Sequence, residues 1–97
     1  MRKVTEKIRI AWRAGESKTV GNTTTDGSSV WLHGNKIIKV EDGEVFATFA
    51  GWHTRTTQDR LNGITDGHFH THKFQPFFND RRIHDDEWVL VGSNKTN

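Results

Sequence analysis

The chain contains no cysteine. This absence excludes a disulfide framework, a metal site built from thiolates and a cysteine nucleophile. Long apolar runs are also missing, and none approaches the roughly 18 residues that a membrane helix needs. The residues that follow Met1 lack the apolar segment of a signal peptide. From these absences we expect a cytoplasmic protein with no membrane partner.

Hydrophobic side chains are scarce as well. They account for 32% of the 97 residues, and the mean hydropathy is -0.77. An ordinary globular domain is about 45–50% apolar when glycine is included. We therefore expect residues 1–97 to fold as a single domain with a thin core, and residues 93–97 to form a polar tail. Because a thin core gains from extra burial, self-association to a homo-oligomer is one expected interaction.

The N-terminal segment, residues 3–13, alternates between apolar and basic side chains. Period-two alternation is typical of a half-buried strand. We therefore predict a strand whose outer face is basic along its length, with Lys3, Lys7, Arg9 and Arg13.

Two turn signals divide the middle of the chain into three apolar runs. Gly34-Asn35 and Asp42-Gly43 are pairs that tolerate positive φ angles and form two-residue hairpin turns. The pattern therefore predicts an antiparallel meander with strands at residues 29–33, 36–41 and 44–50.

A short helix is predicted at residues 54–63. Thr56, or alternatively Thr54, is a suitable N-cap, and Asp59 stands three residues after Thr56, as in a capping box. Gly63 is well placed to end the helix. The side of the helix that faces the sheet would carry Thr57, Leu61 and Ile64.

The flanking segments complete the predicted fold. Residues 87–91 are expected to form a closing strand and residues 17–25 an exposed strand or ordered loop. Residues 68–74 are expected to form a strand that Pro76 restricts to a sheet edge. The result is an α+β fold, mainly β. It contains a small antiparallel sheet, made of the three-stranded meander plus N- and C-terminal strands, and one short helix.

Three segments carry a resemblance to a known group of proteins. They are GNT at residues 21–23, LHGN at 32–35 and GWHTRTTQDRLN at 51–62. In this order they resemble the GNT, LHGN and GWxTxTTxxRLN segments of small proteins encoded by tailed bacteriophages, over roughly residues 20–63. The resemblance implies a phage origin, a location in the host cytoplasm and an accessory role. It assigns no activity, cofactor or catalytic residue.

The segment around Pro76 indicates a protein contact. Two adjacent phenylalanines are followed by two arginines, and exposed aromatic side chains flanked by arginine are common anchors of protein interfaces. We therefore predict a non-catalytic protein that binds and modulates or inhibits a host enzyme or defence complex. The expected contact residues are Phe77, Phe78, Arg81 and Arg82, with Arg55 and Arg60 added from the polar side of the helix.

Nucleic-acid binding is an alternative function. The 14 basic residues exceed the 12 acidic ones by only 2 charges, which is far below the charge density of a DNA-packaging protein. The expected basic face at residues 3–13 nevertheless offers cations to a phosphate backbone, and exposed aromatic rings could stack on bases. The candidate residues are Lys3, Lys7, Arg9 and Arg13.

A histidine cluster supports a second alternative. His68, His70 and His72 would project from one face of a strand, and His84 follows later in the chain. Adjacent pairs can bind a divalent transition metal, and a metal with an open position could activate water for hydrolysis. No G-x-S-x-G nucleophile or phosphate-binding glycine loop is present. Apart from this metal site, we expect neither a cofactor nor an enzyme.

Overall fold

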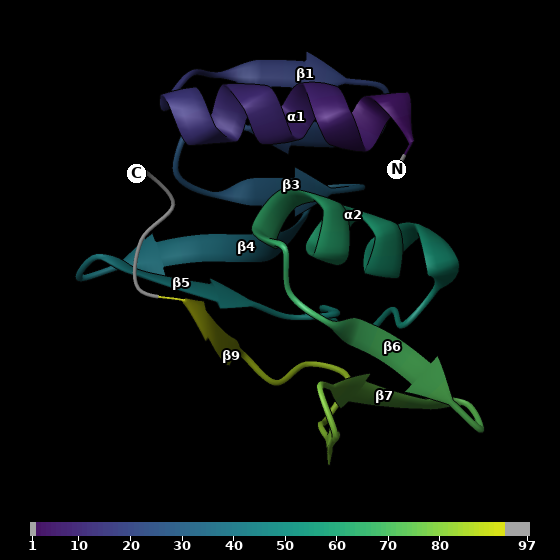
Figure 1. The fold of residues 1–97 in the computed structure, drawn as a ribbon. Coiled ribbons are helices and arrows are strands. Elements are labelled where there is room, and N and C mark those ends of the chain that lie inside the picture. Colours follow the sequence, from purple (N-terminus) through teal and green to yellow (C-terminus); the bar gives the residue numbers. More distant parts are fainter. Residues whose placement is uncertain (1, 93–97) are drawn as a thin grey trace.

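The computed structural model describes residues 2–92, so the predicted polar tail at residues 93–97 lies outside the described residues. The described part is an α+β fold with two antiparallel sheets (Figure 1). Neither of its helices is long and apolar enough to cross a membrane. In chain order the elements are α1 (Lys3–Ala14), β1 (Lys18–Val20), β2 (Thr23–Thr25), β3 (Val30–Leu32), β4 (Asn35–Glu41), β5 (Glu44–Ala47), α2 (Arg55–Thr65), β6 (Phe69–His72), β7 (Gln75–Phe78), β8 (Arg81–Arg82) and β9 (Val89–Gly92).

The larger sheet has the strand order β1-β2-β3-β4-β5-β9, and the predicted meander, β3-β4-β5, lies at its centre. The turn Asp42-Gly43 was predicted correctly, with φ angles of 52° and 79°. The turn before it lies one residue earlier than predicted. His33 and Gly34 are its central residues, with φ angles of 52° and 81°, and Asn35 already pairs with Leu32. Each turn therefore has glycine second, as type I′ geometry favours.

The predicted N-terminal strand is wrong, because residues 3–13 belong to helix α1. The apolar positions 4, 8, 10 and 12 are all even, so they satisfy a period of two, but a spacing of four is also one helical turn. Burial separates the two interpretations. Thr5, Ile8 and Trp12 are buried, whereas Ile10 is 63% exposed. Gly15 ends the helix with φ 73° and donates its N–H to the Trp12 carbonyl oxygen.

Helix α2 is the helix that the sequence predicted, with different ends. Thr54 is the N-cap, and its hydroxyl accepts the N–H of Thr57 at 3.2 Å, so Thr56 is not the cap. Gly63 does not stop the helix, because the next residue, Ile64, packs into the core and Asp66 takes the left-handed conformation that ends α2. The predicted sheet-facing side is confirmed, since Thr57, Leu61 and Ile64 are all buried.

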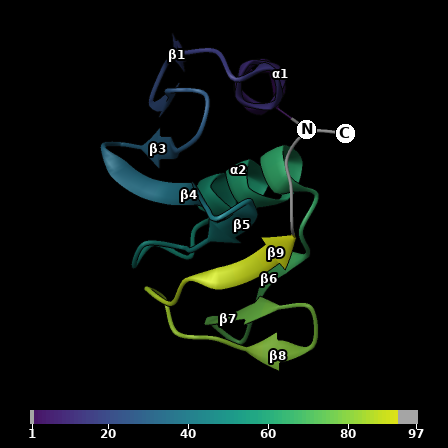
Figure 2. The same ribbon diagram turned by 90° about the vertical axis from the view of Figure 1, so that its left-hand side faces the viewer.

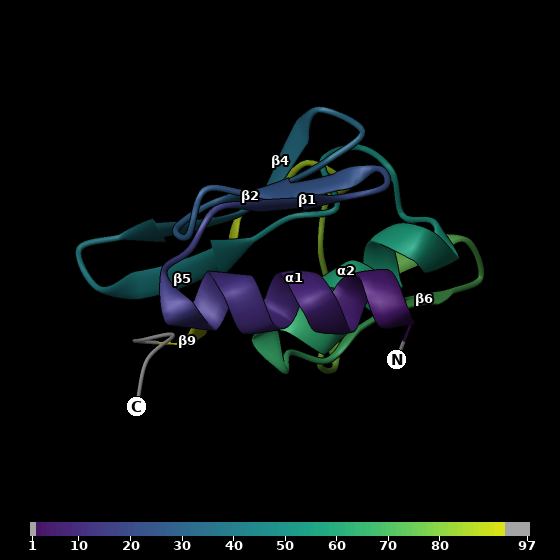
Figure 3. The same ribbon diagram turned by 90° about the horizontal axis from the view of Figure 1, so that it is seen from above.

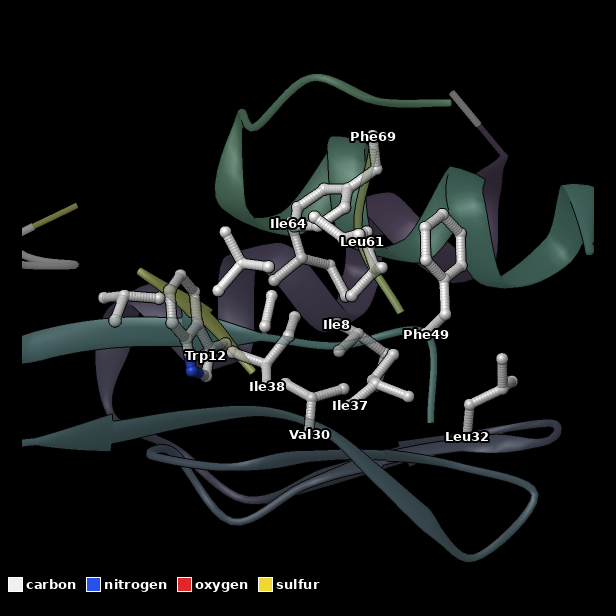
Figure 4. Close-up of a cluster of buried hydrophobic side chains, with 14 residues drawn as sticks. Ile8, Trp12, Val30, Leu32, Ile37, Ile38, Phe49, Leu61, Ile64 and Phe69 are labelled. Carbon is white, nitrogen blue, oxygen red and sulfur yellow. The ribbon is translucent and has the colours of Figure 1, made fainter. Parts of the chain in front are cut away.

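The core lies between the larger sheet and the two helices, which cover the same face of that sheet (Figure 3). The helices run parallel, because Arg2, Thr5 and Arg9 of the α1 segment bond to partners 54 residues later in the chain. Figure 4 shows how side chains from both helices and from the sheet meet: Ile8, Trp12, Val30, Leu32, Ile37, Ile38, Phe49, Leu61, Ile64 and Phe69.

The smaller sheet, β6-β7-β8, stands at the end of the molecule opposite to α1 (Figure 2). Pro76 lies in its central strand and not at an edge, which corrects the prediction. The carbonyl oxygen of Pro76 faces β8 and accepts the N–H of Ile83 at 3.0 Å. A residue's N–H and C=O point to the same side of a strand, so the missing donor of Pro76 leaves the β6 ladder intact. The missing N–H of Pro76 weakens only the pairing between β7 and β8, and β8 ends at Arg82.

Candidate functional site

The two adjacent phenylalanines of β7 lie on opposite faces of the smaller sheet. Phe78 faces inward, with its ring centroid 4.8 Å from that of the buried Phe69. Phe77 faces outward and stacks on His70 at 5.2 Å with an interplanar angle of 14°, and its edge contacts His72. Of the two predicted anchors, therefore, Phe77 is the one on the outer face.

The outer face of the smaller sheet combines aromatic and cationic groups. Cross-strand pairing places His70 beside Phe77, and Phe77 beside Arg82. Lys73 and Phe74 form the turn that joins β6 to β7. We name the whole set, which contains no carboxylate, the hairpin surface: His70, His72, Lys73, Phe74, Phe77 and Arg82.

The tip of the hairpin surface is strained. Phe74 is 88% exposed, and Lys73 and Phe74 have φ angles of 51° and 64°. Their turn has the two-residue type I′ form, in which asparagine and glycine are the usual residues. An L-residue in this left-handed conformation costs about 1–2 kcal/mol. The sequence carries no signal for this turn, because neither position holds glycine or asparagine.

The other predicted contact residues lie apart. Arg81 is exposed and pairs with Glu87 at 3.0 Å, and Arg55 is exposed in the first turn of α2. Arg60 is only 3% exposed, so we leave it out of the contact surface. The sequence contains a sign of this burial. Positions 57, 60, 61 and 64 have the i, i+3, i+4, i+7 spacing of one helix face, and the other three are the residues predicted to face the sheet.

Arg60 joins three elements. Its guanidinium donates to the Thr5 hydroxyl of α1 at 2.7 Å, to the Thr23 hydroxyl of β2 at 2.9 Å and to the Asp59 carboxylate of α2 at 3.1 Å. Thr5 donates in turn to Asp59. Burial lowers the pKa of Arg60 from its usual value, and the charge of Asp59 opposes this change. The arrangement is a structural clamp between α1, β2 and α2.

The single basic face predicted for residues 3–13 is not present. At 100° per residue, the pair Lys3 and Lys7 is centred about 120° around α1 from the pair Arg9 and Arg13. Both arginines bond to Asp66 at the end of α2, Arg9 at 2.7 and 3.0 Å and Arg13 at 2.7 Å. These arginines therefore connect the two helices, and only the lysines are left on the exposed side.

Asp66 provides a pH-dependent test of this connection. The hydrogen bonds from Arg9, and the charges of Arg9 and Arg13, lower the pKa of Asp66 below its usual value. A lowered folded-state pKa contributes stability above the unfolded-state pKa of about 3.9 and loses it as the pH falls through the folded value. We expect Asp66→Asn, which keeps the left-handed cap, to lower the free energy of unfolding by a few tenths to about 1 kcal/mol at pH 7.

The measurement is urea denaturation of both proteins between pH 2 and pH 7. The difference in stability should begin to shrink below about pH 4, where the carboxylate of the unfolded protein is protonated, and should be lost at the lower pH at which the folded protein is protonated as well. A difference that persists unchanged at pH 2 would contradict the role of the carboxylate charge.

The four histidines of the metal hypothesis do not form a cluster. His70 and His72 lie on the outer face of β6, His68 precedes that strand and His84 follows β8. Nowhere in residues 2–92 do three or more histidine or carboxylate side chains come close enough to hold a metal ion.

The segments on which the phage resemblance rests meet around the start of α2. The N–H of His33, in the second segment, donates to the carbonyl oxygen of Asn22, in the first, at 2.9 Å. Arg60, in the third, donates to the side chains of Asn22 and Thr23. A cavity of about 540 Å³ lies between the second and third segments. The three segments therefore form one structural unit.

Comparison with known proteins extends the resemblance to nearly the whole chain. Neither the curated proteins nor the solved structures include a significant match. A family model described as Kyanoviridae Gp96 protein matches residues 1–96. Kyanoviridae are cyanophages, so the predicted phage origin is confirmed. The chain belongs to the Kyanoviridae Gp96 protein family.

Proposed function

We propose that this phage protein is a non-catalytic accessory protein that binds a host protein through the hairpin surface, in the host cytoplasm, and thereby modulates or inhibits it. One observation carries the proposal: Phe74 stands 88% exposed in a left-handed turn. Glycine would relieve the backbone strain, and a polar residue would suit the solvent better. Strained backbone and exposed aromatic rings concentrate at binding sites, which supports a contact role for Phe74.

The hairpin surface has the composition of an interface anchor. Phe74 and Phe77 supply aromatic area, and the flanking His70, His72 and Arg82 supply polar groups around it. Energetically dominant interface residues are commonly aromatic or arginine, surrounded by a polar rim.

The charges of the hairpin surface indicate the partner's chemistry. Lys73 and Arg82 are basic residues, and the set has no carboxylate. Complementary charge accelerates association and disfavours wrong partners. The expected partner is therefore an acidic protein surface with an apolar pocket that accepts the Phe74 ring.

Affinity capture from a lysate of the cyanobacterial host tests the proposal, with and without nuclease. The unmodified protein should retain one stoichiometric host protein in both arms. Phe74→Ser should weaken this binding by about 30-fold or more, the loss that follows from removing an interface anchor worth 2 kcal/mol. The matched control is Ile10→Ser, which removes a 63% exposed apolar residue from α1 at the other end of the molecule.

Two results would overturn the proposal. The first is a captured protein that binds equally well to the Phe74→Ser variant, because the contact would then lie elsewhere. The second is recovery that vanishes with nuclease, because nucleic acid would then be the partner.

A further inference from the structure

A second feature, separate from the hairpin surface, is the cavity between the β3–β4 turn and the entry to α2. Its volume of about 540 Å³ is within the range of small-molecule sites. Leu32, Ile37 and Phe49 line it, and all three are almost fully buried. These side chains give the cavity an apolar floor that belongs to the rigid core.

One of the residues that line the cavity is a tryptophan with an exposed indole. Trp52 is 61% exposed, unlike Trp12, which is buried. Lysine ammonium groups cover the other two indoles, Lys36 over Trp31 and Lys39 over Trp88. Among residues 2–92, no aromatic ring or lysine covers the indole of Trp52, which is one of the residues that line the cavity.

The backbone that carries Trp52 is fixed in an unusual conformation. Ala50 and Gly51 have φ angles of 55° and 86°, and the N–H of Trp52 closes the turn on the Phe49 carbonyl oxygen at 2.9 Å. The N–H of Gly51 is anchored on the carbonyl oxygen of Asp85 at 2.9 Å. A non-glycine residue in this region is strained, and such strain concentrates at binding sites. The backbone position from which the indole projects is thus fixed before any ligand arrives.

Polar groups are among the lining residues of the cavity, and a cation lies at its boundary. Asn35 and Thr56 are among its lining residues, and no carboxylate is. The Thr56 hydroxyl accepts a hydrogen bond from the Arg2 guanidinium at 2.9 Å, which places a cation at the boundary of the cavity. Arg2 and Arg55 together line a second groove, of about 700 Å³, alongside α2.

We propose that this cavity binds a nucleobase, with the base stacked on the Trp52 indole and its phosphate directed toward Arg2 and Arg55. A planar ring matches the indole and the apolar floor. The edge of a base carries donors and acceptors that the Asn35 amide can satisfy together. An anionic group attached to the ring matches the cations at the boundary. The groove that Arg2 and Arg55 line also contains Asp59, but the carboxylate of Asp59 is paired with Arg60 at 3.1 Å. The base comes from a free nucleotide or from a single strand.

Calorimetric titration tests the proposal with defined probes. These are AMP, GMP, CMP and UMP, the four corresponding nucleosides, and single-stranded RNA 12-mers of one base each. We expect saturable binding of at least one mononucleotide. Trp52→Ala should weaken it by about 5- to 150-fold, the range that loss of base–aromatic stacking gives. Phe74→Ala, which removes an exposed ring from the hairpin surface, is the matched control and should bind nucleotides normally.

Two further comparisons sharpen the test. Arg55→Ala should weaken binding of the monophosphate and leave binding of the nucleoside unchanged, and this variant alters an exposed residue outside the core. The 12-mers distinguish the sources of the base. Tighter binding of a 12-mer than of its mononucleotide, after correction for the number of bases, supports a single strand, and equal binding supports a free nucleotide.

Several outcomes would overturn the inference. They are the absence of binding by every nucleobase probe, unchanged binding by Trp52→Ala in a protein that circular dichroism shows to be folded, and an equal loss in the Phe74→Ala control. Binding of a phenylalanine-containing or tryptophan-containing peptide in place of the nucleobase probes would also overturn it, because the cavity would then accept a protein side chain.

Discussion

Replacing Arg60 with methionine is expected to lower the free energy of unfolding by about 3 kcal/mol. Arg60 is 3% exposed, and its guanidinium bonds to Thr5, Thr23 and Asp59. Methionine fills similar space but leaves the Asp59 carboxylate, whose side chain is 23% exposed, without its cation. Removing one partner of a buried ion pair costs about 3–5 kcal/mol, and the partial exposure of Asp59 places the expected loss at the lower end.

For a protein of this length, this loss corresponds to a fall in Tm of about 12–24 °C. Thermal and urea denaturation measure it. Arg55→Met is the matched control, because the same substitution is made in the same helix at an exposed position, where changes are usually within about 0.5 kcal/mol. Equal stability of the Arg60→Met and Arg55→Met proteins would show that the clamp between α1, β2 and α2 contributes little.

Replacing the turn Lys73-Phe74 with Asn-Gly is expected to raise stability while it weakens partner binding. The new pair suits the positive φ angles of 51° and 64° that the turn requires. Relief of about 1–2 kcal/mol of strain, set against the 0.5–1 kcal/mol entropic cost of glycine, gives an expected gain of about 0.5–1 kcal/mol. The same change removes the exposed ring of Phe74, so binding of the host protein should weaken by about 30-fold or more, as for Phe74→Ser.

The opposite directions of these two effects make the experiment informative. A stability gain with a binding loss would show that the strain is retained for contact and not for folding. The matched control is Asp42→Asn, since Asp42-Gly43 is already a favourable turn of the same type at another site. That variant should change neither property. A less stable Asn-Gly protein, or one that binds its host partner normally, would contradict the role assigned to the tip.

The parts of the fold that could be predicted are those marked by residues close together in the sequence, such as turn glycines and a helix cap. Glycine in the turns at Gly34 and Gly43 indicated the meander, and a threonine cap with a spaced apolar side indicated α2. Helix α1 was not predicted, because apolar residues spaced by four positions satisfy both strand and helix periodicity. The burial of Thr5 and Ala11 and the exposure of Ile10, all consequences of tertiary packing, separate the two.

The candidate sites were less predictable than the fold. The sequence singled out Phe77 and Arg82, but it did not predict the Phe74 turn, which lacks the residues that normally mark one. The cavity beside Trp52 could not be predicted at all. It depends on where the β3–β4 turn meets the entry to α2, a contact between distant segments that no local pattern records. Arg60 was predicted to lie on the surface because arginine is a charged residue, although its position in the helix belongs to the buried stripe.

The parallel packing of α1 on α2 has a consequence during protein synthesis. The contacts of Arg2, Thr5 and Arg9 with α2 each span 54 residues. At a translation rate of about 5–20 residues per second, α1 leaves the ribosome some 3–11 s before its partner helix is complete. During that interval the apolar side of α1, with Ile8 and Trp12, lacks its contacts with α2. The first helix to be made thus completes its packing only after the second helix has been made.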